Sequence, residues 1–235
     1  MNTIVIKIDF IFDVFIVFLC IILFLVGLYS VIDNYLMYQS VFDDSLLRYK
    51  PDYEGLSDEE ADQKIISSMV GWVSIDDTDI DFPIMQGIDN IEFLNKDPYG
   101  NYSLTGSIFL DSQNNSDFSD DYNIVYGHHM IGAMFGLLDA YYEEDYFKKH
   151  QYGILYIGEE KHFVEFFAVL SEMATNRTVF SVKTKIKDLL DFIKENHLWI
   201  DNTKLPDTSD KVIALSTCKY PDTIDRTIVL GKISD

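Results

Sequence analysis

The sequence predicts a mainly β domain, built as a barrel or a sandwich, behind one membrane-spanning helix. Short runs of β-forming residues follow one another along most of the chain, and turn-forming Asp, Asn, Gly and Pro separate them. An uncharged apolar run near the N-terminus indicates the membrane helix. With 235 residues and 48% hydrophobic content, the chain is long enough for one compact domain with an appended segment.

The uncharged run covers residues 14–32 and, as a helix, would be about 28 Å long, close to the thickness of a bilayer's hydrocarbon core. A cleaved signal peptide is the alternative. The run is longer than the usual apolar region of about 7–15 residues, and no A-x-A-like site follows it. We interpret it as a retained anchor. Its orientation stays open, because Lys7 precedes it while Arg48 and Lys50 follow it.

We expect three regions: a tip and transmembrane anchor over residues 1–32, a polar stalk over 33–55, and a folded domain over 56–235. The folded domain should begin with a helix, because Ser57 and Glu60 have the spacing of a capping box. That helix should extend to about Ser68.

The remaining elements of the domain are short strands and one helix. β-type runs occupy residues 71–75, 80–85, 107–110, 123–126, 153–157 and 162–170, and two final strands are expected over 211–217 and 226–232. Residues 184–197 form an amphipathic helix whose apolar face carries Ile186, Leu189, Leu190 and Ile193. This order favours a barrel or sandwich over alternating βαβ units.

The net charge and the cysteine content limit the classes of function that the chain can have. The chain has 18 basic and 39 acidic residues and a net charge of −21, which disfavours nucleic acid as a partner. The two cysteines are Cys20, inside the apolar run, and Cys218, so no disulfide framework is expected. Composition alone leaves Cys218 as either an inert core thiol or a nucleophile, and favours the inert thiol.

Three residues could serve acyl-transfer chemistry. Cys218 ends a predicted strand, where a side chain is held rigidly and can still reach a substrate. A cysteine nucleophile needs a proton carrier, and His128 directly follows the glycine after the 123–126 run. Arg226 opens the last strand and could stabilise an oxyanion. A buried thiol, a histidine in a surface turn and an arginine paired with a carboxylate remain the alternatives.

These residues and the segments around them resemble the sortase family. The resemblance rests on residues 215–218 (LSTC), on Arg226 at the start of a terminal strand, and on 126–128 (YGH). Segments 71–75 (GWVSI), 82–86 (FPIMQ), 106–111 (GSIFLD) and 134–138 (MFGLL) are similar to class B sortases in particular. The resemblance covers about residues 66–233.

The resemblance implies a closed eight-stranded β-barrel with an N-terminal helix and a helical insertion before the cysteine strand. It implies a cytoplasmic amino terminus and a catalytic domain outside a Gram-positive cell. Cys218 would attack the threonine carbonyl of a C-terminal sorting signal and form a thioacyl enzyme. His128 would protonate the leaving nitrogen and Arg226 would stabilise the oxyanion, with no cofactor or metal.

The same resemblance implies that Asn90, Leu94 and Ser216 line the groove for the signal. The partners would be secreted proteins with an NPxTx-like or related signal, and a peptidoglycan precursor or other amine acceptor. Two residues depart from the class B pattern: His129 stands where asparagine is common, and Lys219 replaces an acidic residue.

Two other functions stay open. One is a pilin-polymerising sortase, although the stalk carries no convincing aspartate lid motif, because the DDS at residues 43–45 lacks an aromatic partner. The other is a membrane-tethered binding module with an inert cysteine.

Overall fold

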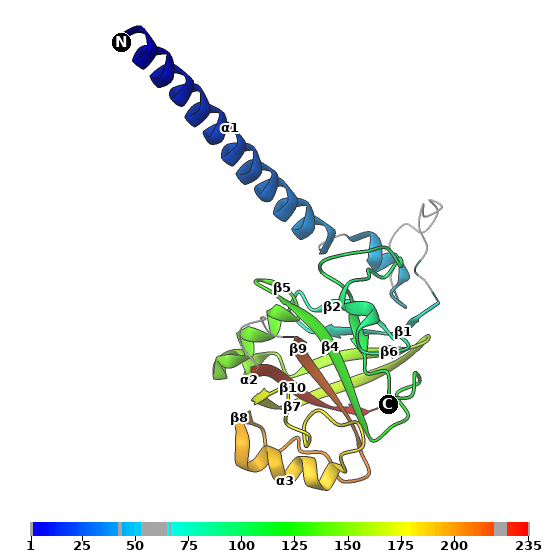
Figure 1. Cartoon of the computed structure of the whole chain (residues 1–235). Coiled ribbons are helices and arrows are strands. Elements are labelled where there is room, and N and C mark those ends of the chain that lie inside the picture. The colour runs from blue at the N-terminus through cyan, green and yellow to red at the C-terminus, as the bar shows by residue number, and fades with distance from the viewer. Residues whose placement is uncertain (1, 42–43, 53–64, 66, 219–224, 235) are drawn as a thin grey trace. The chain divides into compact units, whose positions relative to one another are not determined.

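The computed structural model describes residues 2–41, 44–52, 65, 67–218 and 225–234. The chain divides into two compact units, Met1–Phe42 and Asp43–Asp235. The first unit is one helix and the second contains all the strands (Figure 1). This division lies upstream of the predicted boundary at residue 56.

The first unit is the helix α1, Asn2–Val41. Within it, Phe12–Asp33 is long and apolar enough to cross a membrane, with 22 residues and a mean hydropathy of 3.0. The predicted span of 14–32 falls inside this segment. The helix continues through the first part of the predicted stalk, which is therefore helical as far as Val41.

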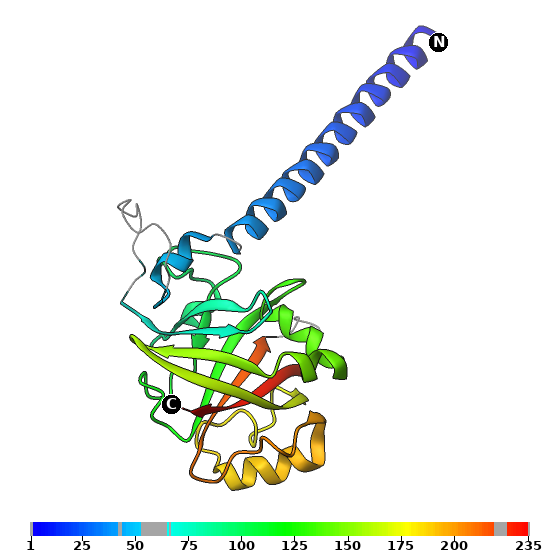
Figure 2. The same cartoon turned by 180° about the vertical axis from the view of Figure 1, so that it is seen from behind.

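Eight strands of the second unit form a closed, mixed β-barrel (Figures 1 and 2). Their order is β10-β9-β4-β3-β2-β1-β6-β7, and antiparallel pairing of β10 with β7 closes the ring. The pairs β2–β3 and β4–β9 are parallel. The strands are β1 (Met69–Ile75), β2 (Asp81–Met85), β3 (Ile108–Leu110), β4 (Tyr122–Met130), β6 (Tyr152–Ile157), β7 (Glu160–Met173), β9 (Lys211–Cys218) and β10 (Asp225–Ser234).

Shorter strands and helices flank the barrel strands. The strand β5 (Ala133–Met134) pairs with the end of β4, and β8 (His197–Ile200) pairs with β7. The helices are η1 (Asp44–Tyr49), η2 (Glu92–Leu94), η3 (Phe135–Tyr142), α2 (Glu144–Lys149) and α3 (Ile186–Asn196). The helix predicted to begin at Ser57 lies outside the described residues except at its end, where Ile65 is not helical and Ser67 and Ser68 form a turn.

The strand β4 is longer than the sequence pattern predicted. We expected the strand to end at Tyr126 and Gly127 to turn the chain, but β4 continues to Met130. Gly127 has a packing role instead, because a Cβ atom there would lie 2.4 Å from Ile108 Cδ1 and 2.6 Å from the Phe135 ring. His128 therefore lies within a strand rather than after one.

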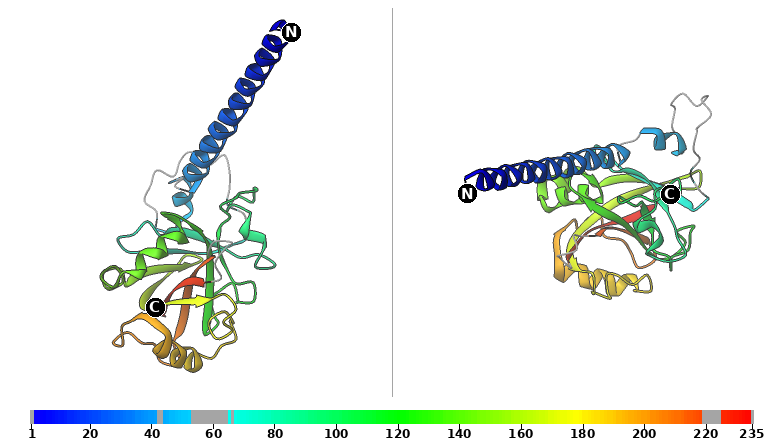
Figure 3. Two further views of the ribbon diagram at one scale, coloured as in Figure 1. Left: turned by 60° about the vertical axis from the view of Figure 1, so that its left-hand side comes forward. Right: turned by 45° about the horizontal axis from the view of Figure 1, so that its top comes forward.

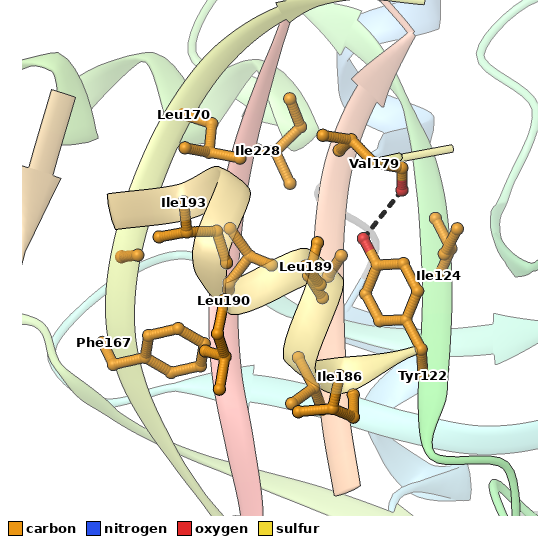
Figure 4. Packing of buried hydrophobic residues seen from close by; sticks show 14 residues of the cluster. Tyr122, Ile124, Phe167, Leu170, Val179, Ile186, Leu189, Leu190, Ile193 and Ile228 are labelled. Atoms are coloured by element: carbon orange, nitrogen blue, oxygen red, sulfur yellow. Dashed lines mark hydrogen bonds between the residues drawn. The ribbon is translucent and has the colours of Figure 1, made fainter. Parts of the chain in front are cut away.

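The predicted amphipathic helix is α3, and its apolar face is buried as expected. The four residues predicted for that face pack against a cluster of strand residues that includes Tyr122 and Ile228 (Figure 4). Figure 3 shows the ribbon of α3 beside the barrel strands. The buried Tyr122 hydroxyl donates to the carbonyl of Val179 at 2.8 Å, and burial raises the pKa of Tyr122. The helix thus covers the sheet before the chain enters β8 and β9.

The segment 44–52 is attached to the barrel, rather than a free stalk. Lys50 Nζ lies 2.8 Å from Asp81 Oδ1, which also accepts a hydrogen bond from the Trp72 indole at 2.6 Å. Asp52 accepts a hydrogen bond from the Tyr156 hydroxyl at 3.0 Å. Burial, with a smaller contribution from Asp52, raises the pKa of Tyr156 to about 12, so this hydroxyl remains a donor at neutral pH.

Replacing both Lys50 and Asp52 with alanine is expected to lower the melting temperature of the full chain by roughly 2–8 °C. Two partly exposed polar contacts contribute about 1–2 kcal/mol together, and a domain of this size shifts about 2–4 °C per kcal/mol. Thermal unfolding followed by near-ultraviolet circular dichroism would measure it. The exposed variant Lys149→Ala is the control. Equal melting of all three proteins would show that the segment adds nothing to stability.

Candidate active site

The predicted nucleophile and the predicted acid–base residue lie on neighbouring strands. In the parallel β4–β9 pair, position 128 stands opposite position 218, at the last step of the register. Neighbouring strands are separated by about 5 Å. The fold therefore brings together two residues that are far apart in the sequence.

Arg226 lies near the start of β10, which pairs antiparallel with β9. The last pair of the β9–β10 register before the site is Ile228 opposite Ser216, two residues from positions 226 and 218. The Arg226 Nη1 donates to the carbonyl of Thr217 at 2.9 Å. This contact fixes a guanidinium beside the backbone that immediately precedes Cys218.

The guanidinium of Arg226 also lies 6.0 Å from the centre of the Phe180 ring. No carboxylate among the described residues lies within ion-pair distance of it. The alternative of a surface arginine neutralised by a carboxylate therefore has no support in the described part of the chain. Among the described residues, the Arg226 guanidinium donates one hydrogen bond, to the Thr217 carbonyl, out of the five N–H groups it carries.

His128 contacts the loop that carries two predicted groove residues. Its Nε2 lies 2.7 Å from the carbonyl oxygen of Leu94 in η2. A carbonyl only accepts hydrogen bonds, so Nε2 carries a proton in this contact. The Leu94 carbonyl thus orients the imidazole ring, and the side chain of Leu94 belongs to the same loop.

Asn90 is held by a buried carboxylate. Its Nδ2 donates to Asp111 Oδ2 at 2.9 Å, and its Oδ1 accepts from the backbone N–H of Ser112 at 2.7 Å. Asp111 is 3% exposed and also accepts a hydrogen bond from the Tyr126 hydroxyl at 3.1 Å. The Asn90 amide keeps one N–H and one lone pair for a ligand.

Ser216 is fully buried, and its hydroxyl donates to the Thr217 carbonyl at 3.3 Å. It shares this acceptor with Arg226. The three predicted groove residues thus occupy two places, with Asn90 and Leu94 in the β2–β3 loop and Ser216 on β9 beside the cysteine position. Lys219, the second departure from the class B pattern, lies outside the described residues.

His129 pairs with a carboxylate that sequence reasoning did not identify. Its Nε2 lies 2.6 Å from Asp139 Oδ2 on η3. The pair has the form of a histidine–carboxylate dyad. However, the His129 side chain is only 5% exposed, and strand alternation puts it on the face of β4 opposite to His128. A substrate on the His128 face would not reach it.

The described residues contain no cluster of side chains that could bind a metal ion. No group of three or more His, Cys, Asp or Glu side chains among them is arranged to hold an ion.

Comparison with known proteins identifies the chain, although no family model matches it. It is 35% identical to Sortase B of Listeria monocytogenes over 192 residues, covering 77% of each chain. It is 27% identical to Sortase B of Staphylococcus aureus over 190 residues, covering 78% of this chain and 75% of the relative.

Comparison with solved structures points to the same family. A Streptococcus pyogenes class B sortase involved in pilus biogenesis superposes with a TM-score of 0.67 and 33% identity, covering 72% of this chain and 94% of that one. A Staphylococcus aureus sortase B–substrate complex gives a TM-score of 0.66 and 26% identity, covering 72% and 81%.

The closed barrel and these relatives define a cysteine transpeptidase of Gram-positive bacteria. The chain belongs to the sortase family, and within it to class B. The eight-stranded barrel and the helical insertion that the resemblance implied are confirmed. As a sortase, it acts on a sorting-signal substrate and an amine acceptor.

Proposed function

We propose that this sortase cleaves a C-terminal sorting signal through a thioacyl intermediate on Cys218 and transfers the secreted protein to a cell-wall amine. The observation that carries the proposal is the β4–β9 register, which stands His128 opposite Cys218, with Arg226 bound to the neighbouring Thr217 carbonyl. A nucleophile, a proton carrier and a fixed cation are the groups that acyl transfer requires.

In the first half-reaction, the Cys218 thiolate attacks the threonine carbonyl carbon of the signal. A C–S bond forms, the C–N bond of the scissile amide breaks, and His128 gives a proton to the departing nitrogen. In the second half, an amine attacks the thioester and gives its proton to His128. The C–S bond then breaks and the thiolate is restored, so atoms and charges balance over the cycle.

Arg226 supplies positive charge where the oxyanion develops. Its contact with the Thr217 carbonyl fixes the guanidinium in place before substrate binds, and a preorganised donor costs no reorganisation at the moment of reaction. Asn90 and Leu94 would contact the signal on the other side of His128, since the Leu94 carbonyl already touches that ring. Ser216, which is fully buried on β9, would support the groove from beneath rather than contact the signal.

An N-terminus in the cytoplasm and a barrel facing the cell wall would suit this reaction, because the secreted substrate and the wall amine meet outside the membrane. The Phe12–Asp33 segment would hold the enzyme there. The signal would be NPxTx-like or a related sequence, and the acceptor a peptidoglycan precursor.

Pilin polymerisation is the second candidate. It is favoured by the Streptococcus pyogenes relative, which is described as involved in pilus biogenesis and superposes over 94% of its length. The chemistry at Cys218 would be identical, and the acceptor would be a lysine amine of another subunit.

Peptide transfer by the full chain in detergent micelles would test the proposal. We expect an NPxTx-like peptide to be cleaved after its threonine, and mass spectrometry to show that peptide joined to an oligoglycine or cell-wall stem-peptide amine. His128→Ala should lose activity by about 100-fold or more, while the exposed His197→Ala should not.

Faster transfer to a lysine within a pilin-derived peptide than to the wall amine would instead establish the second candidate. Cleavage of LPxTG-like peptides alone would reject the NPxTx assignment. Failure to trap any acylated enzyme with either peptide would reject both functions.

A further inference from the structure

Each of the three proposed catalytic residues has a sequence neighbour in one buried polar network. These neighbours are His129, Thr217 and Thr227, and the network centres on Asp139 of η3. None of the four was given a role in the site from the sequence, although His129 was noted as a departure from the class B pattern. Because the three neighbours belong to β4, β9 and β10, the network joins the three strands that carry the site.

Asp139 uses both carboxylate oxygens. Its Oδ2 lies 2.6 Å from His129 Nε2, and its Oδ1 accepts from the Thr227 hydroxyl at 3.4 Å. The Thr227 backbone N–H donates to the Thr217 hydroxyl oxygen at 3.2 Å, and the Thr217 carbonyl holds Arg226. The contacts run without a break from β4 to the arginine.

Burial strengthens these contacts. Thr217 and Thr227 are 0% exposed, and the His129 side chain is 5% exposed. Asp139 itself is 44% exposed at its side chain, so it meets solvent on one side and the network on the other. Hydrogen bonds to a charged group are stronger than those between neutral groups.

The network lies where two of the strand pairings around the site stop, β3–β4 and β9–β10. The β3–β4 pairing ends at Tyr126, two residues before His128, and the β9–β10 register ends at Ser216 and Ile228, whereas the β4–β9 and β7–β10 pairings continue through the site. Beyond that point Thr227 bonds to a side-chain oxygen of Thr217 instead of to the ladder. The strand ends that carry the site therefore depend on side-chain contacts for part of their alignment.

A second set of contacts connects the network to β7. The Thr227 hydroxyl lies 3.2 Å from the Tyr142 hydroxyl, which donates to Ser171 on β7 at 3.2 Å. Tyr142 and Asp139 both belong to η3. This short helix thus makes polar contacts with β4, β7 and β10.

We propose that Asp139 is a positioning residue, which sets the relative placement of His128, Cys218 and Arg226 by holding their neighbours from the opposite face of the sheet. The inference rests on the proposed function of those three residues. It assigns His129 a supporting role and explains how a histidine serves at a position where class B enzymes often have asparagine.

The test compares variants of the full chain in steady-state peptide cleavage. Asp139→Asn keeps the shape and removes the charge, and we expect kcat to fall about 10-fold or more while KM changes less than twofold. His129→Ala should behave in the same way. His129→Gln should retain at least half of kcat, because glutamine Nε2 can take the place of the imidazole Nε2 as a donor to Asp139.

The matched control is Asp145→Asn, which makes the same change of charge at an exposed position on α2. It should retain wild-type kcat. Melting temperatures are measured for every variant, so that a loss of folded protein is not counted as a loss of turnover.

The rate of Cys218 alkylation by iodoacetamide from pH 5 to pH 9 gives a second readout that needs no substrate. A purely structural role would lower stability and leave this pH profile unchanged, whereas misplacement of His128 and Arg226 should shift it. Unchanged kcat and an unchanged profile in Asp139→Asn would overturn the proposal.

The outcomes separate this inference from the function on which it rests. If wild type is active and His128→Ala is inactive, but Asp139→Asn matches wild type, only the positioning role is rejected. If His128→Ala is active and His129→Gln is inactive, His129 is the acid–base residue, and both the supporting role and the assignment to His128 are rejected.

Discussion

Cys218→Ala is expected to abolish peptide cleavage, leaving less than about one part in 10⁴ of wild-type kcat. Alanine removes the sulfur that forms the acyl bond, and loss of a catalytic nucleophile typically costs 10⁴–10⁶-fold in turnover. Fluorescent peptide cleavage would measure the loss. Intact-mass spectrometry would show the acylated intermediate in wild type and its absence in the variant.

The sequence provides a matched control for this experiment in its other cysteine. Cys20 lies exposed on α1, inside the candidate membrane span. Cys20→Ala should retain full turnover and still form the thioacyl adduct. Activity that survives Cys218→Ala but not Cys20→Ala would reject the assigned nucleophile.

The second large effect is expected for Arg226→Ala, which should lower kcat by about 10²–10³-fold. Removing one preorganised oxyanion donor costs roughly 3–4 kcal/mol in other acyl-transfer enzymes. Arg226→Lys should recover only part of the loss, since lysine keeps the charge but has no planar fork to span the Thr217 carbonyl and a substrate oxygen together.

Arg177→Ala is the control, because it removes an exposed arginine from the loop between β7 and α3. It should leave both kcat and KM unchanged. A wild-type rate in Arg226→Ala would mean that the oxyanion is stabilised elsewhere, for example by backbone N–H groups.

The sequence predicted local elements better than their ends. The α3 face of Ile186, Leu189, Leu190 and Ile193 was read correctly, because helical periodicity is a local signal. The end of β4 was predicted wrongly, because glycine usually marks a turn. Gly127 is instead required by the close approach of Phe135. Such approaches depend on residues distant in the sequence.

The residues of the candidate site also differ in whether the sequence could predict them. Cys218, His128 and Arg226 could be proposed from strand ends and motif resemblance, and the register now places their strands side by side. Asp139 gave no signal, because an aspartate in a short 3-10 helix looks like any surface carboxylate. Only the fold shows that η3 places it beneath three strand ends.

The parallel pairing of β4 with β9 also affects when the enzyme becomes competent. Strands that are parallel neighbours cannot form a local hairpin, and closing such long-range contacts is slow compared with local structure. The positions of the thiol and the imidazole are therefore not held together in the unfolded or partly folded chain. The two positions come together only when β4 and β9 pair, so the site forms late, with the closed barrel.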